Sequence, residues 1–501
     1  MAAEPVPAQI SAACEQVRPA APADAVAGMQ PRIVAAPAST GEASALLRAA
    51  AELGLAVVPR GTGTRLSWGN PPARCDLVLE TTGMDRVVEH AAGDLVATVQ
   101  AGARLDRLAE VLGAAGQRLA LDPPGGGTIG GVLASAAAGP LRLRYGTPRD
   151  LLIGITVVRA DGTVAKSGGK VVKNVAGYDI GKLFAGSRGT LGLITQATFR
   201  LHPVPAETAY VTAECAAAVS ACQLIALALG SPASPVAAEI DWPGANDRVR
   251  ICVALEGDQA GVAERAVALA GLLGHDPALS VRPQSPPWWG AGPAAQRDGT
   301  VLQIAFWPGD LGMVLAEVRA AAEAAGLDPA VGGSAAAGVL YAALPADVDP
   351  GTVAAFVAVL RSAVGHGLPA GVRHRLSEAR QPVIHPKPGA RHAPTGGRRG
   401  AARAGRRAAT GERSAARVPA PGGGATAEPG GDVASGVLTR GSRAAEGPPA
   451  RANVVVLHAP PAVGGLVDLF GPVPSLALMR AVKNQFDPAG TMAPGRFAGG
   501  I

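Results

Sequence analysis

Apolar residues between positions 31 and 206 occur in short runs separated by turns rich in glycine and proline. A helix is predicted over Ala43–Leu53, because Ser39 and Glu42 have the S-x-x-E spacing of a capping box and Gly54 stands where helices often end. A second helix is predicted over Ala103–Ala115 from the helical spacing of its leucines. Five apolar runs predict strands: Leu55–Val58, Leu77–Glu80, Leu95–Gln100, Ile153–Arg159 and Thr190–Leu201.

Residues 207–375 alternate between strand-like and helix-like runs. The strand-like runs are Ala209–Ala213, Val249–Leu255, Thr300–Trp307 and Gly338–Leu344. The helix-like runs are Cys215–Leu229, Gly261–Leu273, Leu311–Ala325 and Thr352–Val364. This alternation predicts a second α+β domain with a mainly antiparallel sheet.

The two remaining stretches differ in composition. Residues 1–30 are rich in Ala and Pro and are predicted to form a disordered N-terminal arm. Residues 376–452 are rich in Arg, Gly, Ala and Pro and have almost no periodic apolar positions, which predicts disorder. This composition is also what GC-rich DNA gives when it is read in a wrong frame. A strand at Asn453–His458 and a helix at Leu476–Gln485 then restore order in a C-terminal tail, residues 453–501.

Charge and cysteine content narrow the function classes. Residues 375–451 carry 14 Lys and Arg against 5 Asp and Glu, a balance of +9, so the remaining chain carries −3 of the overall +6. Because this basic stretch lacks the interleaved aromatics that stack on bases, no nucleic-acid partner is expected. No apolar run is long enough to predict a transmembrane segment. Five scattered cysteines without a C-x-x-C pair favour a reducing cytoplasm and no metal site.

Three glycine-rich stretches are the candidates for a ligand-binding site. Arg60-Gly61-Thr62-Gly63-Thr64 follows a predicted strand and is suited to an anion-binding nest of backbone N–H groups. Pro123–Gly131 contains G-x-G-x-x-G, but two prolines stand where a dinucleotide-binding Rossmann fold needs a buried strand. Residues 168–195 hold a third set of glycines, which allow backbone to approach a large flat ligand.

The order and spacing of these stretches resemble the FAD-binding domain of the vanillyl-alcohol oxidase family, also called PCMH-type. The resemblance covers about residues 30–206. The matching motifs are Pro59–Gly69, Thr128-Ile129-Gly130-Gly131, Arg144-Tyr145-Gly146, residues 157–162, Gly177-Tyr178-Asp179 and residues 189–194. Phe486–Gly490 and Pro494–Phe497 resemble the tail that returns to the flavin domain in the glycolate oxidase and D-lactate dehydrogenase branch.

The resemblance implies an α+β fold, with two subdomains holding FAD in residues 31–206 and a cap domain in residues 207–375. It implies that backbone groups of residues 60–64 hold the pyrophosphate and that Ile194 meets the adenine. The implied cofactor-binding residues are Pro59, Arg60, Gly61, Thr62, Gly63, Thr64, Pro124, Gly125, Thr128, Ile129, Gly130, Gly131, Ser135, Tyr145, Gly146, Gly189, Gly192 and Ile194.

Three departures from the family pattern bear on activity. The first loop has no His of the kind that tethers FAD covalently, so non-covalent FAD is expected. Catalytic members carry a His-x-Gly-Asp-Gly-Asn type motif in the cap, whereas Val331–Leu340 here has no His, Asp or Asn to take a proton or bind a metal. Arg188 stands where catalytic relatives tend to have Glu. No catalytic residue can therefore be named.

Two functions remain open from the sequence. In the first, the chain is an FAD-binding subunit of a complex that oxidises a small 2-hydroxy acid, glycolate being favoured, and it passes electrons to a partner. In the second, it is a non-catalytic FAD-holding or assembly subunit beside a catalytic paralogue. The resemblance implies a catalytic FAD paralogue and an iron–sulfur subunit as partners, in the cytoplasm or peripheral at the inner membrane through the complex. Trp288-Trp289 is either a partner-binding patch or a covered cap surface.

Overall fold

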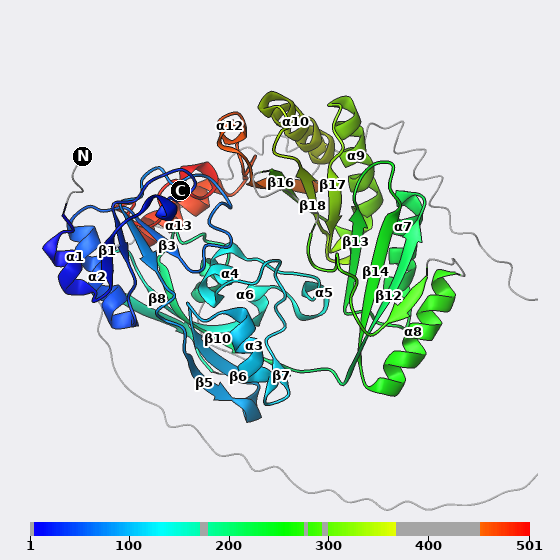
Figure 1. Cartoon of the computed structure of the whole chain (residues 1–501), viewed down its shortest axis with the longest axis horizontal. Coiled ribbons are helices and arrows are strands. Elements are labelled where there is room, and N and C mark those ends of the chain that lie inside the picture. Colours follow the sequence, from blue (N-terminus) through cyan, green and yellow to red (C-terminus); the bar gives the residue numbers. More distant parts are fainter. Residues whose placement is uncertain (1–4, 171–178, 275–278, 293–298, 367–450) are drawn as a thin grey trace, which may run out of the picture. The chain divides into compact units, whose positions relative to one another are not determined.

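The computed structural model describes residues 5–170, 179–274, 279–292, 299–366 and 451–501, drawn in colour in Figure 1. Apart from Arg451 and Ala452, the stretch predicted to be disordered or misread (376–452) lies outside these residues, as do Gly177 and Tyr178 of the third motif. Residues 1–367 and 448–501 belong to one unit. The description below concerns that unit.

The N-terminal domain contains two sheets. The first has the order β1 (Val17–Pro19), β2 (Ile33–Ala35), β4 (Leu77–Glu80) and β3 (Val57–Arg60). β2, β4 and β3 run parallel to one another. Most of their residues are buried, which is usual for strands of a parallel sheet. Helix α2 (Thr40–Glu52) buries Leu46 and Leu47 in the core of this sheet, and its first turn is capped by Ser39, whose Oγ accepts from Glu42 N–H at 3.1 Å. The Ser39 half of the predicted capping box is thus in place, whereas the Glu42 carboxylate accepts from Ala38 N–H instead of Ser39 N–H.

The predicted disorder of residues 1–30 is wrong for the part that the structure describes. Helix α1 (Ala8–Ala13) buries Ile10 completely in the core that α2 also fills. Strand β1 pairs with β2 in antiparallel register. Arg18 and Arg60 both bind Asp24, at 2.6 and 2.8 Å. The prediction from local composition failed because this segment is ordered by contacts with other segments of the chain, which its own composition does not reveal.

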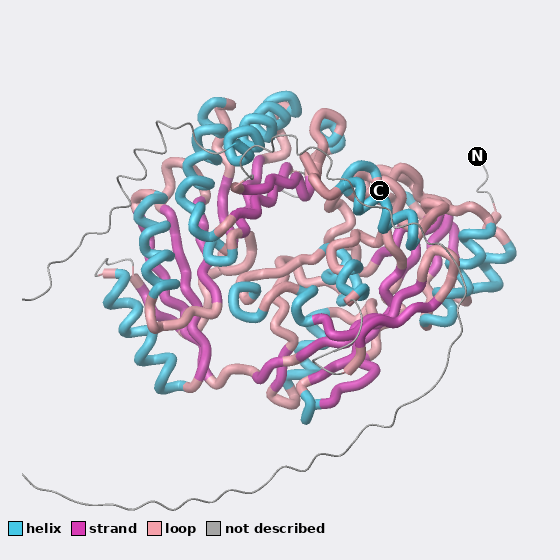
Figure 2. Tube along the Cα trace, turned by 180° about the vertical axis from the view of Figure 1, so that it is seen from behind, coloured by secondary structure: helices cyan, strands magenta, loops and turns pink. Residues whose placement is uncertain are grey.

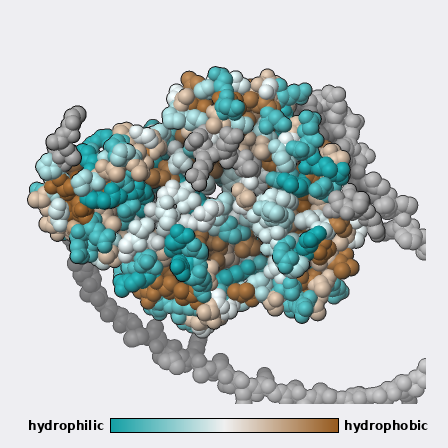
Figure 3. All heavy atoms as spheres, in the orientation of Figure 1, coloured by the Kyte–Doolittle hydropathy of each residue, from teal (hydrophilic) through white to brown (hydrophobic). Residues whose placement is uncertain are grey.

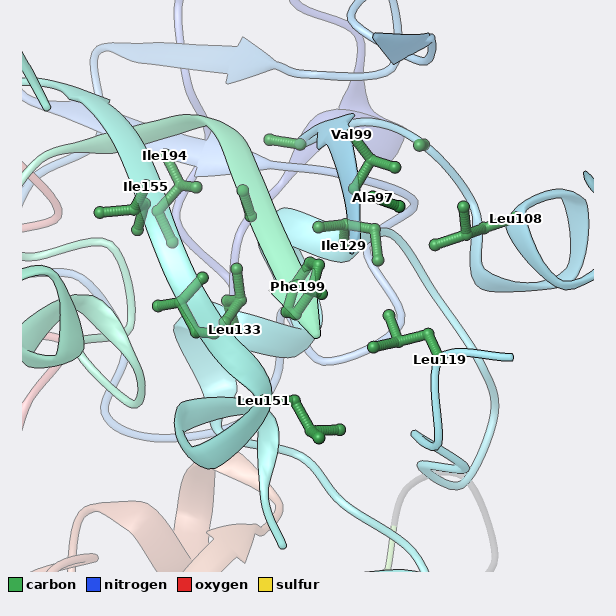
Figure 4. Close-up of a cluster of buried hydrophobic side chains, with 14 of the residues drawn as sticks. Ala97, Val99, Leu108, Leu119, Ile129, Leu133, Leu151, Ile155, Ile194 and Phe199 are labelled. Atoms are coloured by element: carbon green, nitrogen blue, oxygen red, sulfur yellow. The ribbon is translucent and has the colours of Figure 1, made fainter. Parts of the chain in front are cut away.

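The second sheet of this domain is antiparallel, with the order β5 (Val87–Ala91), β6 (Val96–Gln100), β10 (Leu193–Arg200), β8 (Leu152–Val158) and β9 (Val164–Gly168). The β8–β9 hairpin turns at Asp161-Gly162. Helices α3 (Leu105–Gly113), α4 (Ile129–Ser135), α5 (Arg142–Tyr145) and α6 (Pro148–Leu151) belong to this half. Ile129 and Leu133 of α4 lie beside Phe199 of β10 in a common apolar core (Figure 4). A small pair, β7 (Gln117–Arg118) and β11 (His202–Pro203), leads towards the second domain.

The second domain has one antiparallel sheet of eight strands, as its α+β pattern predicts. The order is β15 (Ser280–Arg282), β12 (Glu207–Cys215), β14 (Val249–Gly257), β13 (Ala237–Trp242), β17 (Ala330–Gly333), β18 (Val339–Leu344), β16 (Thr300–Phe306) and β19 (Ala452–His458). Helices α7 (Ala218–Gly230), α8 (Gln259–Leu273), α9 (Leu311–Ala324) and α10 (Pro350–His366) cover one face of the sheet (Figures 1 and 2).

The C-terminal segment contacts both domains. The predicted tail, residues 453–501, therefore does not return to the flavin domain along its whole length. β19 pairs with β16 and so completes the sheet of the second domain. After α12 (Pro461–Gly464), helix α13 (Leu476–Phe486) packs on the N-terminal domain, with Phe486 against Phe184 at 5.6 Å between ring centroids. Val57 N–H donates to Thr491 O and Ala493 N–H to Val57 O, so the tail lies along β3.

The chain leaves and re-enters this unit at one place. Arg451 N–H donates to Val364 O at 3.2 Å, although 86 positions separate the two residues in the sequence. Since a loop can be shortened without strain when its ends already meet, deletion of residues 368–447 with a short Gly-Ser link is expected to shift Tm by less than about 4 °C. Thermal unfolding of the full and shortened chains measures this. A shortened chain that fails to fold would contradict it.

Candidate functional site

The first glycine loop begins at the end of β3 with Arg60. The Arg60 side chain forms ion pairs with two carboxylates, so it does not contribute a free charge to a ligand. Arg60 binds Asp24 at 2.8 Å and Glu80 at 2.6 Å through one terminal nitrogen. The guanidinium is only 11% exposed. The positive charge of Arg60 is therefore compensated, and what this loop offers to a ligand is its main chain and the hydroxyls of Thr62 and Thr64, which are 2.9 Å apart.

The first and second loops are in close contact at Gly61. A Cβ atom on Gly61 would lie 2.1 Å from Thr128 Oγ1, so any side chain there would push the two loops apart. Thr128 also caps helix α4, since its Oγ1 accepts from Gly131 N–H at 3.3 Å. The sequence places glycine where the backbone of the first loop packs against the Thr128 side chain.

The third stretch closes the site from the other side. Gly189 has φ +79° and lies against the Pro59 ring, which a Cβ would approach to 3.3 Å. Arg188, also in the left-handed region at φ +54°, donates its backbone N–H to Ala134 O at 2.7 Å. The strained backbone at Arg188 is held by this contact with α4.

These three stretches line two adjoining cavities, here called the cleft. The first cavity extends from the Thr62–Trp68 loop to Ser135 and Arg496, and the second extends to Thr81 and Ile194. Both include Pro59, Arg60, Gly61, Gly131, Ala134 and Arg188, so these residues mark the passage between the cavities. Of the residues predicted from the sequence, the cleft brings together Pro59, Arg60, Gly61, Thr62, Gly63, Thr64, Thr128, Gly130, Gly131, Ser135, Gly189, Gly192 and Ile194.

Five predicted residues do not line the cleft. Pro124 and Gly125 line a separate cavity together with Asp122 and Trp289. Ile129 is fully buried in the core. Gly146 lines none of the cavities, its α-carbon lying against the Asp150 side chain.

Tyr145 is the fifth, and it joins the two domains instead. Its hydroxyl donates to Glu256 Oε2 at 2.6 Å and accepts from Arg118 at 2.9 Å. Arg118 also binds Glu256, at 2.5 Å. The partner of the tyrosine comes from the second domain, and no local pattern in the sequence could have indicated it.

Three arginines that line the cleft were not predicted as site residues. Arg65 donates to Gly126 O at 2.8 Å and Pro124 O at 2.5 Å, which holds the second loop in position. Arg188 was noticed only as a departure from the family pattern. Arg496 comes from the C-terminal tail, where the Pro494–Phe497 motif was the signal that this segment returns to the site.

Two carboxyl groups with raised pKa values lie in different domains, Glu239 in the second domain and Asp122 in the N-terminal domain. Glu239 on β13 is 4% exposed and hydrogen-bonds the Ser334 hydroxyl, and burial raises its pKa to about 8. Burial likewise raises the pKa of Asp122 to about 6, although both of its carboxylate oxygens accept from Leu141 N–H. The apolar stretch Val331–Leu340 therefore does face an acidic group, which the sequence analysis missed because the group lies on another strand.

The two tryptophans that the sequence left undecided are both partly covered. Trp289 packs edge-on against Tyr210, with 5.2 Å between ring centroids, and Arg250 lies over Trp288 at 5.7 Å. These contacts favour a cap surface over a partner-binding patch.

A family model described as an FAD binding domain matches residues 31–168. Residues 31–168 are an FAD-binding domain. FAD is thus the cofactor, and the predicted α+β fold of PCMH type is confirmed for this chain.

Curated relatives match about a third of the chain. The glycolate oxidase subunit GlcD of Bacillus subtilis is 40% identical over 177 residues, which are 35% of this chain and 38% of that protein. A D-lactate dehydrogenase of Archaeoglobus fulgidus is 39% identical over 174 residues, 34% of this chain and 39% of that protein. The mitochondrial D-lactate dehydrogenase (cytochrome) 1 of Saccharomyces cerevisiae is 37% identical over 186 residues, 36% and 32% respectively. The chain therefore spans little more than a third of the length of these relatives.

Solved structures share the fold over both domains. p-Cresol methylhydroxylase with substrate bound gives a TM-score of 0.57 at 13% identity, covering 71% of this chain and 85% of that one. Alkyldihydroxyacetonephosphate synthase gives 0.54 at 16% identity, covering 67% and 71%. This structural similarity supports the two-domain arrangement of the FAD-binding fold. Because the sequence identities are low, it supports no particular reaction.

The described residues offer neither a metal site nor a membrane span. They contain no group of three or more His, Cys, Asp or Glu side chains that could hold a metal ion. None of their helices is both long and apolar enough to cross a bilayer. The face shown in Figure 3 mixes hydrophilic and hydrophobic residues.

Proposed function

We propose that this chain is the smaller FAD-binding subunit of a complex that oxidises 2-hydroxy acids, with glycolate as the substrate. The observation that carries the proposal is the convergence of the three glycine-rich stretches on one cleft inside an FAD-binding domain. The names of the relatives, glycolate oxidase subunit and D-lactate dehydrogenase, point to 2-hydroxy acids as the substrate class.

The residues of the cleft fit a dinucleotide. Residues 60–64 line the first cavity, and backbone N–H groups of such a glycine-rich loop would suit a diphosphate. Ile194 lines the second cavity, where its main chain suits an adenine. Pro59, Gly61 and Gly131 lie between them. The close packing of Gly61 against the Thr128 side chain leaves no room for a side chain at position 61, which supports a cleft wall with few side chains there.

We also propose that FAD is held non-covalently. Among the described residues that line the cleft there is no His, Cys or Tyr side chain to form a covalent bond to the flavin.

FAD held by residues 59–64 and 128–131 would supply a two-electron acceptor for oxidation of the hydroxy acid. The hydroxyl proton must then go to a base. Glu239 hydrogen-bonds Ser334 of the stretch 331–340, and because burial raises its pKa to about 8 it is mainly protonated at neutral pH.

This observation favours a second candidate function, a non-catalytic subunit that holds FAD beside a catalytic paralogue. In either case the partners we propose are a catalytic FAD subunit and an iron–sulfur subunit that accepts electrons. A cytoplasmic complex is consistent with five free thiols and no disulfide among them.

An absorbance spectrum of the purified chain, followed by anaerobic addition of glycolate, tests these proposals. A yellow protein whose flavin is released into the supernatant by acid precipitation is expected, because the cofactor is non-covalent. Bleaching by glycolate in the chain alone supports the catalytic function, and bleaching only after the paralogue is added supports the second candidate. A well-folded chain that is colourless and takes up no added FAD would contradict both.

A further inference from the structure

Two arginines from distant parts of the chain meet at the cleft. Arg188 precedes β10, and Arg496 lies in the C-terminal tail; both line the first cavity. They also meet at Gly69, where a Cβ would lie 2.9 Å from Arg496 O and 3.2 Å from Arg188 Cδ. Arg188 lies over the Phe470 ring, 5.5 Å from its centroid, which orients the guanidinium.

The pair carries positive charge that the described residues do not compensate. No ion pair in the described part of the chain joins either guanidinium to a carboxylate. Arg496 is 4% exposed; its Nη2 donates to Leu66 O at 2.7 Å and Trp68 O at 2.9 Å, but its buried Nη1 has no partner among the described residues.

Burial, together with the charge of Arg496, lowers the pKa of Arg188 to about 10, and burial lowers the pKa of Arg496 to about 10. Both side chains remain cationic at neutral pH. A buried cation without a counter-ion, such as Arg496, is costly, and the half-buried Arg188 adds a second uncompensated positive charge to the same cavity. The arrangement is therefore that of a site which an anion completes.

The position of Arg188 indicates which anion this is. Arg188 is one of the few residues common to both cavities and so lies at the passage between them. A dinucleotide that fills both cavities has its diphosphate at that passage. We infer that Arg188 and Arg496 together bind the diphosphate of FAD, so that the C-terminal tail forms part of the cofactor site. This inference rests on the proposed FAD binding.

A consequence is that tail docking and cofactor binding are coupled. The tail is anchored on the N-terminal domain through Lys483, which donates to Thr190 O at 2.7 Å and Met492 O at 2.9 Å. By linkage, a ligand that neutralises Arg496 also stabilises the docked tail.

Binding of FAD, ADP and riboflavin to the flavin-free full-length chain tests the inference. Arg188→Gln and Arg496→Gln are each expected to raise Kd for FAD and for ADP roughly tenfold, because each removes a charge-assisted contact to phosphate. Riboflavin has no phosphate, so its Kd should change less than about threefold. Arg188→Gln is the cleaner variant, since Arg496 also holds the 66–68 loop, and Arg496→Lys should recover part of the affinity.

Arg480→Gln is the matched control, because Arg480 is an exposed arginine of the same tail that donates to Gly499 O and does not line the cleft. It should leave all three constants unchanged. Unchanged FAD and ADP binding in both Gln variants would overturn the inference. So would equal weakening of riboflavin, which would indicate a contact with the ring, and so would weakening of glycolate binding alone, which would indicate a substrate carboxylate. Failure of the unaltered chain to bind FAD would instead overturn the proposed function.

Discussion

Gly61→Ala is expected to raise Kd for FAD roughly 100-fold. The new Cβ would lie 2.1 Å from Thr128 Oγ1 and 3.1 Å from both Thr128 Cβ and Cγ2, so the first loop must move away from the second. Overpacking at a close contact costs about 1–3 kcal/mol, and the displaced N–H groups no longer converge on the diphosphate. Flavin fluorescence titration of the flavin-free chain measures the change.

A control and a rescue separate this effect from a general loss of fold. Gly93→Ala lies in the same domain, where an added Cβ meets nothing within 4 Å, and it should leave Kd unchanged. Thr128→Ala in the Gly61→Ala background removes two of the three contacts and should restore part of the affinity, as a double-mutant cycle would show. Equal affinities of the Gly61→Ala variant and the unaltered chain would show that the loops are not fixed by this contact.

Sequence periodicity predicted the elements whose stability is mainly local. The helix after Ser39 begins at its cap, and β4 begins and ends at the predicted residues. β13 and β17 were missed, although each pairs with the strand that follows it in the sequence, β14 and β18 respectively. Helix α4 was missed because its sequence, Ile-Gly-Gly-Val-Leu-Ala-Ser, has poor helix propensity. The Thr128 cap and the burial of Ile129 and Leu133 stabilise it instead.

The glycines of the candidate site could be predicted from the sequence. The side chains from distant segments that complete the site could not. Glycine positions are visible in the sequence, so Gly61, Gly131 and Gly189 could be named in advance. The partner of a side chain is not visible. Tyr145 was expected at the cofactor but binds Glu256, and Arg188 meets a tail residue that is 308 positions further on in the sequence. Such pairings depend on how distant segments pack and leave no local pattern.

Glu239→Gln is expected to stabilise the chain at high pH by about 3–5 kcal/mol. The folded pKa of about 8 lies above the unfolded value of 4.5, so the folded state binds the proton more tightly. The contribution of Glu239 to stability is therefore full below pH 4.5 and is lost as the pH rises to about 8. Above that pH the chain carries a buried carboxylate near Asp122, with Arg142 the nearest compensating charge and the Cys252 thiol on the paired strand. Glutamine keeps the shape and the hydrogen bond to Ser334 without this cost.

Urea unfolding at pH 5 and pH 9 measures the difference. At pH 5 the variant and the unaltered chain should agree within about 1 kcal/mol, since Glu239 is then protonated in the folded state. The exposed Glu323→Gln is the control and should change stability by less than about 0.5 kcal/mol at either pH. A stability gain that is equal at both pH values would show that Glu239 is ionised in the folded chain at pH 5. In that case a carboxylate would be available to take the substrate proton, and the argument for the non-catalytic function would lose its main support.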